Sequence, residues 1–233
     1  MRFVFALLVA MCVALATPAP GFAQSPTQST GAYAPGHLAA ARDMLHAFLI
    51  DTGTLEISSL QAFELMGHQF RQPILASQMY IALPPARQEA LLAYMNNLGP
   101  VVQEEALRGA PQVIEQFAPR VAALFSEAHL RDIAAFMRTP EGSSFFLRSV
   151  TDGVERVATG GPAQTQPSAA EMAAAQAFDQ TPAGRAFTAR AREMGAVMHD
   201  LGAASVGGPH IINRIRRDMC AVLETDCPRG WRS

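Results

Sequence analysis

A pattern of aromatic, Thr-Pro and glycine residues occurs twice in the second half of this chain. The segments 126–145 and 168–187 share the motif A-F-x-x-T-P-x-G-x-x-F. Because a residue before proline avoids helical backbone, a helix that reaches the first phenylalanine must break at the threonine. Threonine is also a favourable helix N-cap and proline suits the first helical position, so a second helix begins at once. The motif therefore predicts two helices joined by a sharp corner, present twice.

Each motif position has a mechanical role in this corner. Ser126 and Ser168 are expected to cap the first helix of each copy, and Glu171 completes a capping box in the second. Gly142 and Gly184 fall in the first turn after the corner, where a missing side chain lets the preceding helix approach closely. The paired phenylalanines are expected to pack inside the elbow. The residues assigned to the two corners are Phe136, Thr139, Pro140, Gly142, Phe178, Thr181, Pro182 and Gly184.

Apolar residues recur at three- and four-residue steps through most of the remaining chain, as in the series Leu38, Ala41, Leu45 and Phe48. No segment alternates in the manner of a strand. We therefore expect an all-α fold, a bundle of helical hairpins that carries the duplicated corner. We expect the first helix to end at Gly53 and the second to begin at the cap Thr54 and to kink or end at Pro73. A third helix is expected to begin at Pro84-Pro85 and to end at Gly99-Pro100. Two separate helices are then expected over 101–107 and 111–125.

The N-terminus has the pattern of a secretory signal peptide. Arg2 supplies a positive start, an apolar run covers 3–16, and the small residues Gly21 and Ala23 precede Gln24. The run is short for a bilayer-spanning helix of about 20 residues, although an uncleaved anchor is the alternative. We expect export to the periplasm, or else secretion, with no transmembrane segment after cleavage.

These patterns divide the chain into six parts. They are a signal peptide (1–23), a flexible mature N-terminus (24–36), a helical domain with the first corner (37–159), a linker or long loop (160–167), a segment with the second corner and the C-terminal helix packed on the same bundle (168–227), and a tail (228–233).

Residues 125–130 (FSEAHL) and 133–142 (IAAFMRTPEG) resemble the hallmark of a bacterial exported family catalogued as domain of unknown function 2059. The resemblance is strongest over residues 84–150. Members of that family carry a helix that ends in phenylalanine, followed by Ser/Thr-Pro-x-Gly. The resemblance implies a helical periplasmic domain. It implies no activity, because the family has no established catalytic residues.

Cys220 and Cys227 are the only cysteines after the predicted signal peptide. In an oxidising compartment such a pair favours a disulfide over two free thiols. On one continuous helix the two residues would lie about 10.5 Å apart, which is too far to bridge. A bond therefore requires the helix to end between them, and its role would be structural.

No motif in the chain indicates a catalytic, cofactor or metal site. All 18 cationic residues are arginines, so lysine-based chemistry is excluded, and the formal charge of −2 argues against a nucleic-acid binder. The glycine-rich stretch 202–209 holds Ser205 near His210, but the spacing fits no nucleophile motif and a loop explains it. Three pairs suit copper(I), although methionine more often fills core gaps; they are Met44 with His46, Met66 with His68, and Met198 with His199.

The predicted C-terminal helix places Arg214, Arg216 and Arg217 off its apolar stripe. An anionic surface, a lipid headgroup or an acidic protein of the envelope would fit these arginines, and an ordinary solvated face is the alternative. We expect a non-catalytic binding or interaction module of the bacterial cell envelope. The alternatives are an enzyme with an unrecognised site and a soft-metal (copper) binder.

Overall fold

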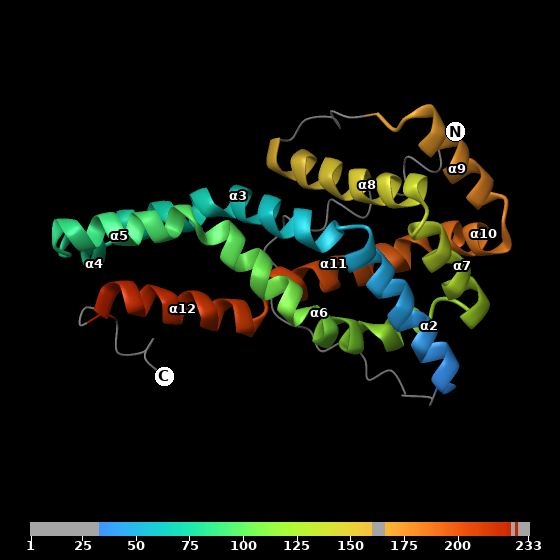
Figure 1. The fold of residues 1–233 in the computed structure, drawn as a ribbon, viewed down its shortest axis with the longest axis horizontal. Helices are drawn as coiled ribbons and strands as arrows, with labels where there is room; N and C mark the ends of the chain where they lie inside the picture. The colour runs from blue at the N-terminus through green and yellow to red at the C-terminus, as the bar shows by residue number, and fades with distance from the viewer. Residues whose placement is uncertain (1–32, 160–165, 225–226, 228–233) are drawn as a thin grey trace. The chain divides into compact units, whose positions relative to one another are not determined.

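The computed structural model describes residues 33–159, 166–224 and Cys227. These residues form eleven α-helices and one π-helix, and among them no strand occurs, so the predicted all-α bundle is confirmed (Figure 1). In the same residues no helix is long and apolar enough to cross a membrane. The predicted signal peptide and the tail 228–233 lie outside the described residues, as does most of the segment 24–36.

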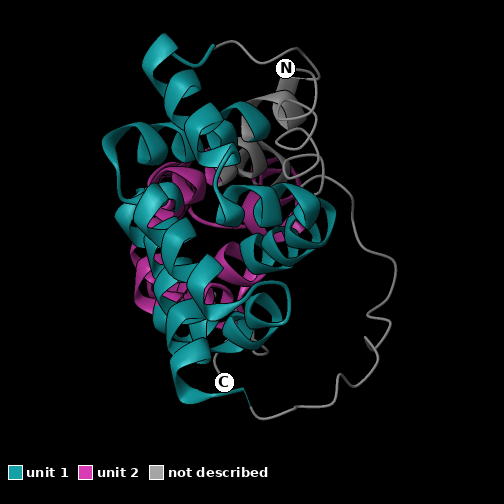
Figure 2. Cartoon of the chain, turned by 90° about the vertical axis from the view of Figure 1, so that its right-hand side faces the viewer, with its two compact units in different colours: residues 1–54, 111–203 teal, residues 55–110, 204–233 magenta. Residues whose placement is uncertain are grey.

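The chain forms two compact units (Figure 2). Unit 1 holds residues 1–54 and 111–203, and unit 2 holds residues 55–110 and 204–233. Both Thr-Pro corners belong to unit 1, whereas the C-terminal helix belongs to unit 2. The division between the units therefore does not fall at residues 160–167, of which 160–165 lie outside the described residues.

In unit 1 the central element is α7, which packs against α2, η2, α8 and α10. Its residues Leu130 and Ile133 are fully buried, as is Met44 of α2. The elements of this unit are α2 (Pro35–His46), the π-helix η2 (Ala47–Asp51), α7 (Glu127–Met137), α8 (Pro140–Thr159), α9 (Ala169–Asp179), α10 (Pro182–Ala189), and parts of α6 (Leu98–Ala122) and α11 (Ala191–Gly207).

The two corners have the same hydrogen bonds and the same close approach. α8 begins at Pro140 and α10 at Pro182, directly after the capping threonines. The Thr139 hydroxyl accepts a hydrogen bond from the Gly142 N–H at 3.0 Å, and Thr181 accepts from Gly184 at the same distance. A Cβ atom on either glycine would lie 2.0 Å from a carbonyl oxygen of the preceding helix. Only glycine therefore permits this helix contact.

The motif phenylalanines form a cluster that spans both corners. Phe136 stacks on Phe178, its counterpart in the second copy, with ring centroids 4.3 Å apart. Phe146, which is not part of the motif, lies at the centre and makes edge contacts with Phe136, Phe187 and Phe48. The aromatic packing thus joins one corner to the other.

Unit 2 is built from α3 (Thr54–Leu75), α4 (Gln78–Ile81), α5 (Pro85–Asn96), α12 (Pro209–Leu223) and the adjoining parts of α6 and α11. α5 packs along α12 (Figure 1). The buried residues of the core cluster are Leu83, Leu91, Met95, Leu98, Met219, Leu223 and Cys227.

The structure corrects the expected break between 101–107 and 111–125. A single helix, α6, runs from Leu98 to Ala122 and contains Pro111 and Pro119. Apolar residues on both sides of Pro111 are buried, namely Val102, Ala106, Val113 and Phe117. Burial of this continuous stripe outweighs the hydrogen bond and the local strain that each internal proline costs. The expected end of α5 at Gly99-Pro100 is also wrong, because these residues form the first turn of α6, where proline is tolerated.

The expected loop over 202–209 is likewise wrong. α11 continues to Gly207 and α12 begins at Pro209, so Gly208 alone separates the two helices. Gly208 is extended (φ −62°, ψ 151°), and a Cβ on it would lie 2.6 Å from the His210 ring. The alanine-rich sequence sustains the helix despite its glycines, and proline at the first position of α12 sets the break.

Candidate functional site

The three arginines of the predicted anionic-partner surface have different environments in α12. Arg214 donates from Nη1 to the Oε1 atom of Glu105 at 3.0 Å and from Nε to the Oδ2 atom of Asp218 at 2.7 Å. Glu105 is only 4% exposed and also pairs with Arg108 of the same helix. Arg214 is therefore bound to a buried carboxylate within unit 2, and the expectation that it faces a partner is corrected.

Tyr94 of α5 extends this ion-pair network. Its hydroxyl donates to Asp218 at 3.4 Å. Burial, and then the charge of Asp218, raise the pKa of Tyr94 well above its usual value. Tyr94 therefore stays protonated and acts as a donor at every physiological pH. The network ties α12 to α5 and α6, which gives it a structural role.

Arg216 and Arg217 are exposed, and within the part of the chain that the structure describes neither forms an ion pair. Their neighbours Ile215 and Met219 pack into the core cluster of unit 2, so the two guanidinium groups lie off the helix face that faces this core. We name these two residues the basic face of α12. Its guanidinium groups are available to bidentate anions such as phosphate or carboxylate.

The end of α12 is fixed by a covalent bond and by α5. Cys220 and Cys227 form a disulfide with a Cα–Cα distance of 4.9 Å, and the helix ends at Leu223 between them, so both parts of the prediction are confirmed. Glu224 turns the chain with φ 48°. Arg87 of α5 donates to the carbonyl of Val222 at 2.6 Å and pairs with Glu224. The helix that carries the basic face is therefore held at its C-terminal end.

The residues considered as soft-metal ligands are not gathered into one site. Met44 is fully buried, whereas His46 is exposed and its Nδ1 lies 3.1 Å from Asp51. Met198 is buried in unit 1 and His199 is half-buried. The side chains of Met66 and His68 lie outside the described residues. Among the side chains that are described, no group of three or more His, Cys, Asp or Glu residues is placed to hold a metal ion.

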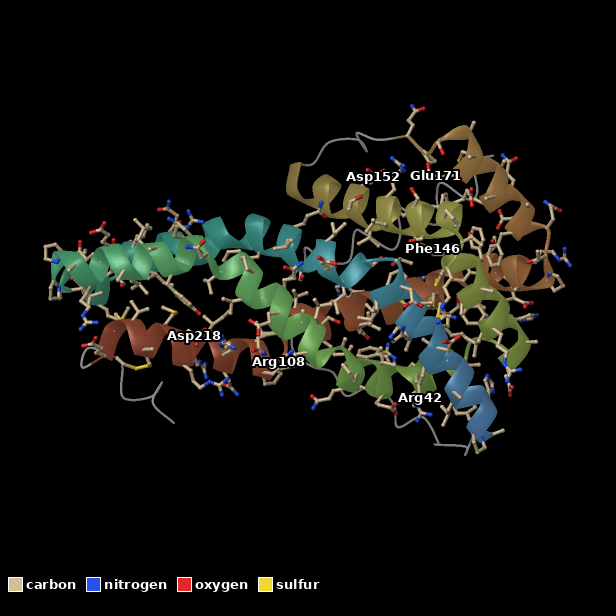
Figure 3. The ribbon with its side chains drawn as sticks, in the orientation of Figure 1. Arg42, Arg108, Phe146, Asp152, Glu171 and Asp218 are labelled. Carbon is tan, nitrogen blue, oxygen red and sulfur yellow. A yellow bond between two sulfur atoms is a disulfide. The ribbon has the colours of Figure 1, made fainter. Side chains whose placement is uncertain are left out.

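The buried carboxylate of Glu171 in unit 1 forms hydrogen bonds beyond the predicted capping box. Glu171 completes the predicted capping box, since it accepts from the Ser168 N–H at 2.6 Å. It also accepts from Ser144 and from Arg148 of α8, the latter at 2.9 Å (Figure 3). The hydrogen bond from Ser144, followed by that from Arg148, lowers the pKa of Glu171 to about 2 against the opposing effect of burial. The cap therefore also joins α9 to α8.

A second ion-pair cluster lies at the first corner. Arg138, directly before Thr139, donates to both carboxylate oxygens of Asp43 at 2.7 and 3.0 Å and to Asp51 at 2.7 Å. The hydrogen bond from Arg138 lowers the pKa of Asp43. Asp51 is the last residue of the π-helix, which brings its carboxylate to the corner. No local sequence signal indicates this cluster, because its members are distant in the chain.

Comparison of the chain with protein-family models, with curated proteins and with solved structures gives no match. The resemblance of residues 84–150 to domain of unknown function 2059 stays a prediction. The fold and the site define a class: an all-α protein whose disulfide-closed C-terminal helix carries two exposed arginines that form no ion pair within the described residues.

Proposed function

We propose that this chain is an exported, non-catalytic binding protein of the bacterial cell envelope that holds an anionic partner on the basic face of α12. One observation carries the proposal. Arg214 forms ion pairs with Glu105 and Asp218 of the same protein. Arg216 and Arg217, in contrast, are exposed and form no ion pair among the described residues. Free guanidinium groups on a fixed helix bind an anion without first giving up an internal ion pair.

Two further features support export. The N-terminal residues have the composition of a signal peptide. The Cα atoms of Cys220 and Cys227 lie 4.9 Å apart, a distance typical of disulfides, and such bonds persist in oxidising compartments such as the periplasm.

The resemblance to an exported family catalogued without an activity agrees with a binding role. The repeated corner agrees with it too, because we interpret the repeat as an internal duplication that builds a rigid scaffold.

The test is crosslinking in intact envelopes followed by affinity purification. The variant Arg216→Gln/Arg217→Gln removes the basic face, and Arg185→Gln/Arg192→Gln is the matched control, because it changes the net charge equally at exposed arginines of unit 1. We expect the first variant to lose its crosslinked partner or lipid and the control to keep it. Equal capture by the wild type and both variants would overturn the proposal.

A further inference from the structure

The outer side of α12 combines cationic, amide and apolar side chains. Ile212, Asn213, Arg216 and Arg217 are all exposed, Ile212 to 43%. Residues four apart lie side by side on a helix, so Ile212 is next to Arg216 and Asn213 is next to Arg217. We name these four residues the α12 ridge. The ridge adds an apolar group and an amide to the two guanidinium groups of the basic face.

Carboxylates on α12 and on the adjoining part of α6 are held by arginines that are not part of the ridge. Asp218 is the only carboxylate of α12, and it pairs with Arg214 at 2.7 Å. On α6, Glu104 and Glu105 both pair with Arg108. Glu105 also pairs with Arg214. Because these negative charges are neutralised within the protein, the potential over the ridge is positive and attracts anionic groups.

The composition of the ridge favours a protein partner over a lipid surface. The apolar stripe of α12 is already packed inside unit 2, where Ile211, Met219 and Leu223 are buried. Helices that lie in a bilayer surface insert a whole apolar face, whereas Ile212 is the only large apolar side chain that α12 exposes. A single apolar side chain beside arginines is instead typical of protein interfaces, in which an apolar centre has a polar rim.

We infer that the α12 ridge binds a helix of a partner protein that carries two carboxylates beside an apolar residue. The side-chain rows of one helix pack between those of a facing helix. In this arrangement Ile212 contacts the apolar residue, and the guanidinium groups of Arg216 and Arg217 bind the carboxylates. The disulfide holds the C-terminal end of α12, so little ordering is needed on binding. The inference deepens the proposed function, on which it rests, because it names the anionic partner as an acidic helix.

The experiment is fluorescence anisotropy with the disulfide-bonded protein purified from the periplasm of the expressing cells. The probe is a fluorescein-labelled helical peptide in which pairs of glutamates one turn apart flank a central leucine. A second peptide, with glutamine in place of each glutamate, measures the contribution of charge. We expect the wild type to bind the acidic peptide about tenfold more tightly than the glutamine peptide, and the difference to shrink as salt is added.

Exposed positions of the ridge allow tests of its apolar group and of its charge. Ile212→Gln should weaken binding of the acidic peptide about fivefold. Leu107→Gln is the matched control, because Leu107 is also a large exposed apolar side chain of unit 2 but lies on α6. Asn213→Asp should weaken binding about threefold and Asn213→Lys should strengthen it by a similar factor, because the two changes alter the charge beside Arg217 in opposite directions.

The guanidinium groups are tested with the variants used for the proposed function. Arg216→Gln/Arg217→Gln should weaken binding of the acidic peptide about tenfold. Arg185→Gln/Arg192→Gln, which changes the net charge equally in unit 1, should leave it unchanged. Matching thermal melts show that each variant is folded.

Two results would overturn the inference. One is a wild-type protein that binds the two peptides equally or binds neither, and the other is binding of the acidic peptide that Arg216→Gln/Arg217→Gln leaves unchanged. Vesicles of phosphatidylglycerol are the comparison probe. If they bind the wild type but not Arg216→Gln/Arg217→Gln, while the acidic peptide does not bind, the inference fails and the proposed function stands with lipid as the partner.

Discussion

The ring of Phe136 lies parallel to the ring of Phe178, at an interplanar angle of 4°. Each residue occupies the last turn of the helix that precedes a Thr-Pro break, so the stack joins the two corners at equivalent points. Stacked aromatic pairs contribute about 1 kcal/mol beyond the area that they bury. The duplicated motif is therefore part of a single packed cluster.

This stack predicts a measurable coupling energy. We expect Phe136→Leu and Phe178→Leu each to lower the free energy of unfolding, and the double variant to lose about 1 kcal/mol less than the sum of the two. Urea unfolding of the four proteins in the double-mutant cycle measures the difference. Strict additivity would show that the two rings do not interact in solution.

The corner glycines should not tolerate a methyl group. Gly142→Ala places a Cβ 2.0 Å from the Phe136 carbonyl oxygen, so the two helices must separate, and we expect a loss of about 3 kcal/mol. Gly207→Ala is the matched control, because nothing lies within 4 Å of a Cβ at that helical position. That control should gain up to about 1 kcal/mol from helix propensity. Thermal melts compare the two, and similar melting temperatures would contradict the close approach.

The pKa of Glu171 predicts a pH dependence of stability. The folded protein lowers the pKa from 4.5 to about 2, so the unfolded chain takes up the proton first as the pH falls. The stabilisation is fully present above pH 4.5 and is lost progressively between that value and about pH 2.

Glu171→Gln removes the charge and keeps the shape of the side chain. It should cost about 2 kcal/mol at pH 7, since hydrogen bonds to charged groups are the stronger ones. The difference from the wild type should narrow as the pH falls toward 2. Urea unfolding at several pH values measures it, and a difference that does not change with pH would contradict the role of the carboxylate.

The local features of this fold follow from its sequence, and the distant contacts do not. Thr139, Pro140 and Gly142 set the corner within one turn of backbone, so cap, proline and close approach can be predicted from spacing alone. The ion pairs of Arg138 with Asp43 and of Arg214 with Glu105 depend on which helices pack together, and helical periodicity does not specify the pairing. For this reason the sequence groups Arg214 with Arg216 and Arg217, whereas in the structure Arg214 pairs with Glu105 and Asp218.

The expected helix break before Pro111 is wrong for a similar reason. Pro111 has the local chemistry of a helix start, so the sequence predicts a new helix there. The buried stripe on both sides of it keeps α6 continuous, because tertiary burial exceeds the local cost of one proline. Burial of this kind depends on the partner helices and is not visible in the local sequence.

Substitutions of Arg214 and of Arg216 should have different effects on thermal stability. Arg214→Gln leaves the buried Glu105 with only Arg108 as a partner, so we expect the melting temperature to fall by several degrees. Arg216→Gln removes an exposed cation that forms no ion pair in the described part of the chain, so the melting temperature should stay unchanged. Differential scanning calorimetry of the two variants makes the comparison, and a larger effect from Arg216 would reverse the assignment of the two residues.

The disulfide should stabilise unit 2 through the last turn of α12. Cys220 and Cys227 close a short loop, for which the chain-entropy relation gives about 2.5 kcal/mol. Cys227 also packs in the cluster with Leu83 and Leu223, so its release exposes apolar surface of that cluster. We expect Cys220→Ser/Cys227→Ser to unfold at lower urea concentration, and wild-type protein treated with a reductant to behave alike. Thiol labelling before and after reduction verifies the state of the bond. Labelling of both cysteines without a reductant would show that the bond does not form in the isolated protein.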